Sequence, residues 1–177
     1  MLYPHTESRR ISLCPASASD APAAYELLFR MGHGGLPTID QFVSGFGRGM
    51  AAYFLVRLKE TDELVGLATI SEPNPAGHVR VEVNVRTDQP SGIVRDATAL
   101  TTNFAFSMWR IRKVYFHVTR SGVESLAFGE EHTAMVREEA VLRDHVFFHG
   151  CTWDVTVLAI HREDWNVLGV DLLKQLV

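Results

Sequence analysis

Apolar and polar positions change their period twice between Val79 and Val118. Valines alternate with polar residues over 79–85, which is the two-residue period of a half-buried strand. Apolar residues then recur at helical spacing over 93–108, and the segment 114–118 returns to a strand-like composition. The pattern predicts a strand, a helix and a second strand in direct succession.

A short break separates the first strand from the helix. It reads Gln89-Pro90-Ser91-Gly92, and both proline and glycine interrupt regular structure. A loop that runs from a strand into a helix points backbone N–H groups at one spot, and the positive end of the helix dipole adds to them. This loop can therefore hold an anion such as a pyrophosphate.

The rest of the chain reads as further strands and helices with no repeat and no linker. Ser19 is the expected N-cap of the first helix, whose early Pro22 is tolerated because the first N–H groups lack intrahelical partners. The predicted strands are 10–15, 52–59 and 64–71, the predicted helices are 19–31, 39–47 and a short one in 168–177, and a long hairpin pairs 136–148 with 152–161.

The loop resembles a known phosphate loop. In the GCN5-related N-acetyltransferase (GNAT) superfamily this loop reads Gln/Arg-x-x-Gly-x-Gly/Ala, and here it reads Gln89-Pro90-Ser91-Gly92-Ile93-Val94, with valine at the last position. The chain is most similar to the branch that modifies ribosomal-protein N-termini and small amines. Segments resembling the family's first strand, third strand, C-terminal hairpin and closing segment follow in the family's order over nearly the whole chain.

The resemblance implies the fold. We expect a single α/β domain over residues 1–177, with the acyl-CoA N-acyltransferase fold. That fold is a mixed, mostly antiparallel and strongly bent sheet with helices on both faces. The length of 177 residues agrees, because such a chain can bury a core without dividing into domains.

Composition limits the partners and the cellular location that we expect for the protein. Apolar residues make up 46% and charged residues 21%, as in an ordinary globular domain, and a net charge of −4 disfavours a nucleic-acid partner. No apolar run has the length of a membrane span or of a signal peptide, so no membrane partner is expected. Cys14 and Cys151 form no metal-ligand pattern, which favours a reduced, cytoplasmic protein without a metal. The oligomeric state stays open, a homodimer included.

The resemblance also implies an activity and a co-substrate. It predicts acyl transfer from acetyl-CoA, or another acyl-CoA, to the amine of a small molecule or of a peptide N-terminus. In the family the pantetheine arm lies along the fourth strand, which places Val83 and Val85 beside it. The pyrophosphate would lie on the loop formed by Gln89, Pro90, Ser91, Gly92, Ile93 and Val94.

The catalytic candidates are Glu82 and Ser121. Glu82 could act as the general base that deprotonates the amine, and its other reading is a solvated or salt-bridged strand residue. Family members commonly carry a tyrosine after the fifth strand that protonates the leaving thiolate, together with a nearby asparagine. In this chain Tyr115 is the last tyrosine, and no asparagine lies between Phe116 and Trp165. Ser121 could supply the proton through water, or it could cap a helix.

Two classes of function therefore stay open. The retained Gln89 and Gly92 favour an acyltransferase. The missing tyrosine and asparagine favour a fold relative that has lost acetyl transfer and binds a ligand or partner, or performs another reaction in specialised metabolism.

Histidines offer little sign of a metal site. His145 and His149 are four positions apart, but on a strand that spacing separates them by about 13 Å. His117 lies on the same strand face as Tyr115 and could line the cleft between the diverging strands, but we expect it to be a packed core histidine.

Overall fold

The computed structural model describes residues 2–119, 122–148 and 150–177 and confirms the expected α/β fold. The strands are β1 (Ile11–Pro15), β2 (Met50–Leu58), β3 (Leu64–Ser71), β4 (His78–Val85), β5 (Lys113–Val118), β6 (Val136–Phe148) and β7 (Cys151–His161). The helices are α1 (Ala21–Arg30), α2 (Ile39–Gly45), α3 (Ser91–Met108), α4 (Glu130–Thr133), α5 (Arg162–Asp164) and α6 (Val170–Leu176), with a π turn at Trp165–Gly169. No helix in the described part of the chain is long and apolar enough to cross a membrane.

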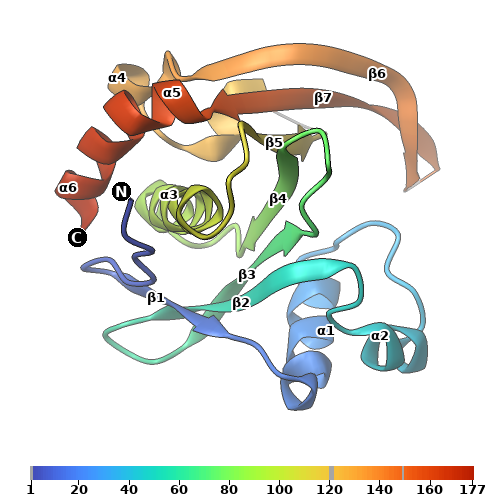
Figure 1. The fold of residues 1–177 in the computed structure, drawn as a ribbon. Helices are drawn as coiled ribbons and strands as arrows, with labels where there is room; N and C mark the ends of the chain where they lie inside the picture. Colours follow the sequence, from blue (N-terminus) through green and yellow to red (C-terminus); the bar gives the residue numbers. More distant parts are fainter. Residues whose placement is uncertain (1, 120–121, 149) are drawn as a thin grey trace.

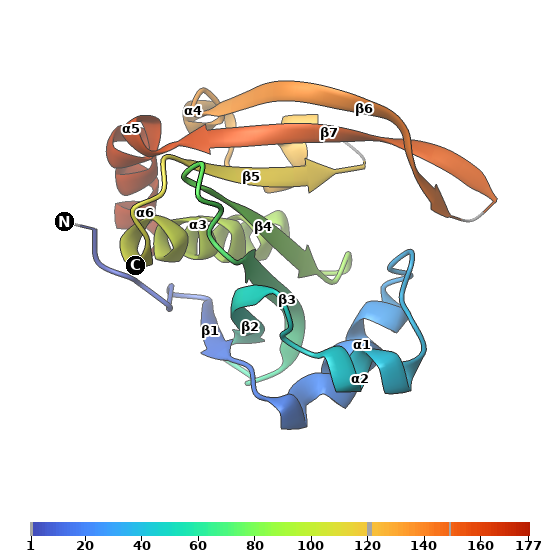
Figure 2. The same cartoon turned by 45° about the vertical axis from the view of Figure 1, so that its right-hand side comes forward.

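The sheet divides where β4 meets β5. Its strand order is β1-β2-β3-β4-β5-β7-β6, and among the described pairs only β4–β5 is parallel. These two strands pair over three positions, His78–Arg80 with Lys113–Tyr115. Beyond those positions the two ribbons diverge (Figure 2). The divergence leaves the second half of β4 without a neighbour on that side.

Helices cover the two faces of the sheet differently. α3 lies on one face beside β4, whereas α1 and α2 lie together on the side of β2 and β3 (Figure 1). The valines of β4 face α3, and Val79 and Val81 are fully buried there. Ile93, Ala97 and Leu100 of α3 are buried in the same core, as the helical spacing predicted.

The cap of the first helix differs from the prediction. The N-cap of α1 is Asp20, not Ser19, and Ser17 is the N-cap of the short 3-10 turn before it. The backbone N–H of Ser17 donates to Asp20 Oδ2 at 2.8 Å. Ser17 has the acidic residue three positions later that a capping box requires, whereas Ser19 does not. A 3-10 turn over Ala18–Asp20 therefore precedes α1.

A polar cluster ties the last three strands together on the face away from α3. The Glu139 carboxylate of β6 reaches across β7 to accept hydrogen bonds from Lys113 Nζ and, at 2.8 Å, from the Tyr115 hydroxyl. His161 of β7 lies 3.4 Å from the same carboxylate. Lys113 first, and the Tyr115 and His161 bonds after it, lower the pKa of Glu139 to about 2.

This cluster makes stability depend on pH. A carboxylate whose pKa falls on folding stabilises the native state above its unfolded pKa, near 4.5, and this contribution is lost as pH falls toward 2. Glu139→Gln should therefore lower the free energy of unfolding by roughly 0.5–1 kcal/mol at pH 7, since the pair is partly solvated. The difference from wild type should shrink between pH 4.5 and 2 in urea titrations. A difference that stays constant over this range would contradict the assignment.

Candidate active site

Glu82 lies in a row of polar side chains that crosses three strands. Tyr53 of β2 pairs with Thr69 of β3, and Thr69 pairs with Glu82 of β4. Residues opposite one another in antiparallel strands point to the same face. The three side chains therefore share the face covered by α1 and α2, opposite the valines that face α3.

Polar groups surround the Glu82 carboxylate. Asn84 Nδ2 donates to its Oε1 at 3.0 Å, and His33 Nε2 lies 3.8 Å from the same oxygen. Burial, and secondarily the negative charge of Glu82, raises the pKa of Tyr53 to about 12, so this phenol keeps its proton at neutral pH. The Glu82 side chain remains 42% exposed, so a ligand can reach it.

Two cavities meet at Glu82 and His33. The first, here called the α2 cavity, has a volume of about 340 Å³ and lies among α1, α2 and strands β2 to β4. The second, here called the hairpin cavity, has a volume of about 440 Å³ and lies between the diverging β4 and β5, beneath the β6–β7 hairpin. Glu82 and His33 line both cavities, which places this carboxylate between two separate ligand spaces.

His117 lies in the hairpin cavity together with Arg80 and His145. The expectation of a packed core histidine is wrong, because the side chain is exposed. Among the described strand pairs, β5 has no β4 partner at this position. Burial of part of the ring first, and then its neighbours Arg80 and His145, lower the pKa of His117 below its usual value, although Glu82 opposes them. The imidazole is therefore neutral at neutral pH.

The loop between α1 and α2 touches the β6–β7 hairpin at a glycine. A Cβ built on Gly34 would lie 2.8 Å from the ring of Phe148. A larger residue at position 34 would require the Phe148 side chain or the loop to shift. This close approach joins the two walls of the hairpin cavity.

The predicted phosphate loop retains free donors. The N–H groups of Ser91 and Gly92, at the start of the 18-residue α3, have no hydrogen-bond acceptor among the described residues. Ile93 differs, because its N–H donates to the Pro90 carbonyl and its side chain is 5% exposed in the core. Two free N–H groups at the positive end of a long helix suit an anion.

The other residues predicted to contact the cofactor lie on either side of these free N–H groups. Gln89 donates its side-chain amide to Asp88 at 3.3 Å, so it is turned back along the loop. Val94 is half-buried and lies outside the apolar core. Val83 and Val85 of β4 are half-buried on the α3 face, because β5 has already diverged from them.

Gly92 is packed against an arginine from the start of the chain. A Cβ at Gly92 would lie 2.5 Å from Arg10 Nη1. Arg10 is held there by the fully buried Asp96 of α3, to which Nε donates at 2.9 Å and Nη2 at 2.5 Å. Ser8 donates to the same carboxylate at 2.7 Å. The absence of a side chain at position 92 therefore also lets the N-terminal segment lie against α3.

The usual general acid has no counterpart in the described lining of the hairpin cavity, which contains no tyrosine. Tyr115 lies where β4 and β5 still pair, and its hydroxyl is bonded to Glu139. Ser121 falls outside the described residues, so its proposed role stays a prediction.

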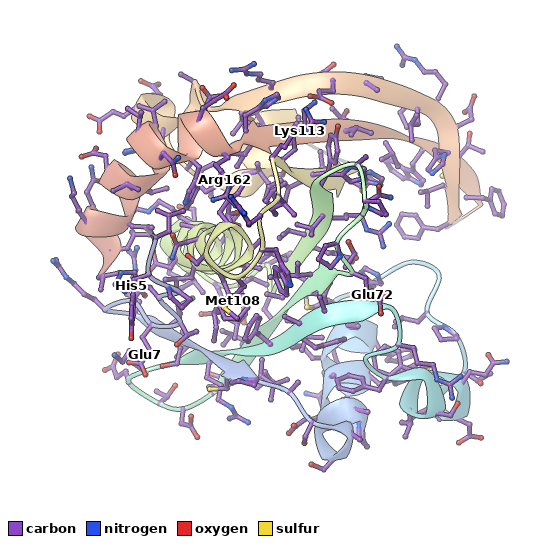
Figure 3. All side chains as sticks on the ribbon, viewed as in Figure 1. His5, Glu7, Glu72, Met108, Lys113 and Arg162 are labelled. Carbon is purple, nitrogen blue, oxygen red and sulfur yellow. The ribbon has the colours of Figure 1, made fainter. Side chains whose placement is uncertain are left out.

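Three basic residues follow α3, namely Arg110, Arg112 and Lys113. They lie at the opposite end of that helix from the phosphate loop. A helix of 18 residues is about 27 Å long, so these residues cannot reach an anion held by Ser91. Arg162 lies at this end and donates to the carbonyls of Phe106, Trp109 and Ile111, which closes the helix (Figure 3).

Sequence reasoning missed the residues that surround Glu82. Tyr53, Thr69 and Asn84 come from three strands, and His33 comes from a glycine-rich loop. Side chains two positions apart in a strand share a face, which places Asn84 beside Glu82. This alternation is the one sequence pattern that predicts Asn84 as a neighbour of Glu82. The contribution of β2 depends on strand register, which residue patterns alone do not define.

Comparison with known proteins supports the fold. No protein-family model matches the chain, and no curated protein matches it in sequence. Among solved structures, a mutant form of the spermidine/spermine N-acetyltransferase SpeG from Vibrio cholerae aligns with a TM-score of 0.73 at 18% identity, covering 88% of this chain and 96% of that one. Spermidine N-acetyltransferase from Vibrio cholerae in complex with CoA and spermine aligns with a TM-score of 0.71 at 16% identity, covering 88% and 98%.

A third solved structure agrees with these two. It is a probable acetyltransferase of the GNAT family from Chromobacterium violaceum, with a TM-score of 0.69 at 17% identity, covering 92% of this chain and 88% of that one. The chain therefore has the GNAT acetyltransferase fold.

The contact between Gly92 and Arg10 yields a stability prediction. Gly92→Ala gains about 1 kcal/mol of helix propensity. It also displaces a guanidinium whose charged hydrogen bonds each contribute about 1.5–3 kcal/mol. We expect a net loss of about 1 kcal/mol in the free energy of unfolding, measured with urea.

A double-mutant cycle isolates this contact. In an Arg10→Ala background the steric cost disappears, so Gly92→Ala should become stabilising. A Gly92→Ala variant that is more stable than wild type with Arg10 present would show that the guanidinium moves away freely.

Proposed function

We propose that this protein is an acyl-CoA-dependent N-acyltransferase that acts on the amine of a small molecule or of a peptide N-terminus. The observation that carries this proposal is the position of Glu82, whose carboxylate borders two cavities beside the divergence of β4 from β5. Transfer between two bound molecules needs such a junction, because the nucleophile and the acyl group must meet next to a proton acceptor.

The structural neighbours support the nature of both ligands. One of them was crystallised with CoA and spermine, an amine. In this chain, acyl-CoA would enter the hairpin cavity and place its pyrophosphate on the free N–H groups of Ser91 and Gly92. The amine would occupy the α2 cavity. The acetyl group and other acyl chains are both compatible with this arrangement.

The proposed chemistry balances without a metal or an oxidant. Glu82 accepts one proton from the bound ammonium, and the free amine nitrogen then attacks the thioester carbonyl carbon and loses its second proton to water. The C–N bond forms and the C–S bond breaks, so the products are an amide and a thiolate of CoA. Water supplies the proton to the thiolate, with Ser121 as the other candidate from the sequence.

Binding of coenzyme A tests the first half of the proposal. Ser91→Pro removes one free N–H at the first position of α3, where proline is tolerated. A lost charge-assisted contact of about 1.5–2 kcal/mol should raise Kd by roughly 10- to 30-fold in isothermal titration. Ser91→Ala keeps the N–H and should bind like wild type. Equal binding by the two variants would remove the loop from the site, and no binding by wild type would exclude the acyltransferase.

Turnover tests the second half. Glu82→Gln keeps the shape of the side chain and removes the base, so kcat should fall by about 10²- to 10⁴-fold at pH 7. The deficit should shrink as pH approaches the amine pKa, near 10, because free amine then needs no base. Glu60→Gln, an exposed turn residue, is the matched control and should be silent. Wild-type turnover by Glu82→Gln across this pH range would exclude Glu82 as the base.

A further inference from the structure

The α2 cavity has a largely apolar wall. Its apolar lining includes Leu36, Phe42, Phe46 and Leu67, and the aromatic ring of Tyr53 adds to them. Three of its rings form a continuous run, since the Phe42 and Phe46 centroids are 5.7 Å apart and those of Phe46 and Tyr53 are 4.3 Å apart. Because these three rings line the cavity, an aromatic ring bound there can make offset or edge-to-face contacts with them.

The charges of the α2 cavity are few. Glu82 is the one carboxylate among its described lining residues, and Arg48 is the one permanent cation. Arg48 is exposed, and its guanidinium has no hydrogen bond or ion pair with any described residue. An ammonium group can therefore pair with Glu82 at the strand end of the cavity, while further ammonium groups would meet an unneutralised arginine.

We infer that the acceptor is a primary amine with one positive charge, carried on an aromatic or similarly apolar body. This inference rests on the proposed function and specifies its acceptor. The amine would lie at Glu82, and the body would lie against Phe42, Phe46 and Tyr53. A polyamine is disfavoured twice, because its extra charges lose water without a carboxylate partner and because Arg48 repels them.

The wild-type protein tests this inference directly. We compare kcat/KM for 2-phenylethylamine, ethylamine and spermidine with acetyl-CoA, following release of the CoA thiol. The phenyl group should raise kcat/KM over ethylamine by about 100-fold, mostly through KM, and phenylethylamine should exceed spermidine by at least about 10-fold. A kcat/KM for spermidine equal to or above that for phenylethylamine would overturn the inference and leave the acyltransferase standing.

Two variants with matched controls locate the effect. Phe46→Leu keeps an apolar side chain but removes the ring, so KM for phenylethylamine should rise about 5- to 10-fold while KM for ethylamine stays constant. Phe29→Leu, at an exposed phenylalanine outside the cavity, should change neither value.

Arg48→Gln should lower KM for spermidine and leave KM for the other two amines unchanged. Arg9→Gln, at an exposed arginine of the N-terminal segment, should leave KM for spermidine unchanged. Equal effects of variant and control would place the acceptor elsewhere.

Direct binding separates this inference from the proposed function. Phenylethylamine is titrated into the protein without acyl-CoA, in calorimetry, for wild type and Phe46→Leu. Binding that weakens in the variant supports the apolar amine site even if no acyl group is transferred to any amine. No phenylethylamine binding, with or without CoA, overturns the inference.

Discussion

The three-residue pairing between β4 and β5 is the constraint on which the site depends. Parallel pairing over His78–Arg80 fixes the two strands side by side, and their divergence afterwards opens the sheet in its middle. Backbone groups on that side of β4 then lack a partner strand, and unpaired backbone groups favour a ligand that can satisfy them. The hairpin cavity and the exposure of His117 both follow from this divergence.

The two flanks of the opening are held by different interactions. On one side Lys113 and Tyr115 are tied to Glu139, which binds β5 to the hairpin strands. On the other side the apolar face of β4 is packed on α3, and Asp96 secures α3 to the N-terminal segment through Arg10. Apart from Val81, which belongs to the core under α3 and also lines the hairpin cavity, the residues named for these flanks do not line the opening. Polar side chains there can consequently point at a ligand without being needed for the core.

Local patterns predicted most of the strands and helices, whereas their arrangement into one fold was expected from the family resemblance. The alternation of valines defined β4, the helical spacing of Ile93, Ala97 and Leu100 defined the buried face of α3, and the hairpin was placed with an error of one residue. These signals are short-range, so a single sequence carries them. The contact of Arg10 with Gly92 and the approach of His33 to Glu82 depend instead on how distant segments fold together. The sequence alone suggested that Gly92 is a phosphate-loop residue. The structure adds a second reason for glycine at this position, which is its packing against Arg10.

The lack of a tyrosine acid should slow acyl transfer less than the common occurrence of that tyrosine in the family suggests. Proton transfer matters most where a poor leaving group or a charged nucleophile would otherwise block the reaction. An alkylamine with a pKa near 10 is almost fully protonated at pH 7, so deprotonation is the step that needs help. A thiol has a pKa near 8.5, so its thiolate can leave before it is protonated and then take a proton from water. Under the proposed function, Glu82 beside the α2 cavity would therefore supply the more important half of the catalysis, even without an acid beside the leaving group.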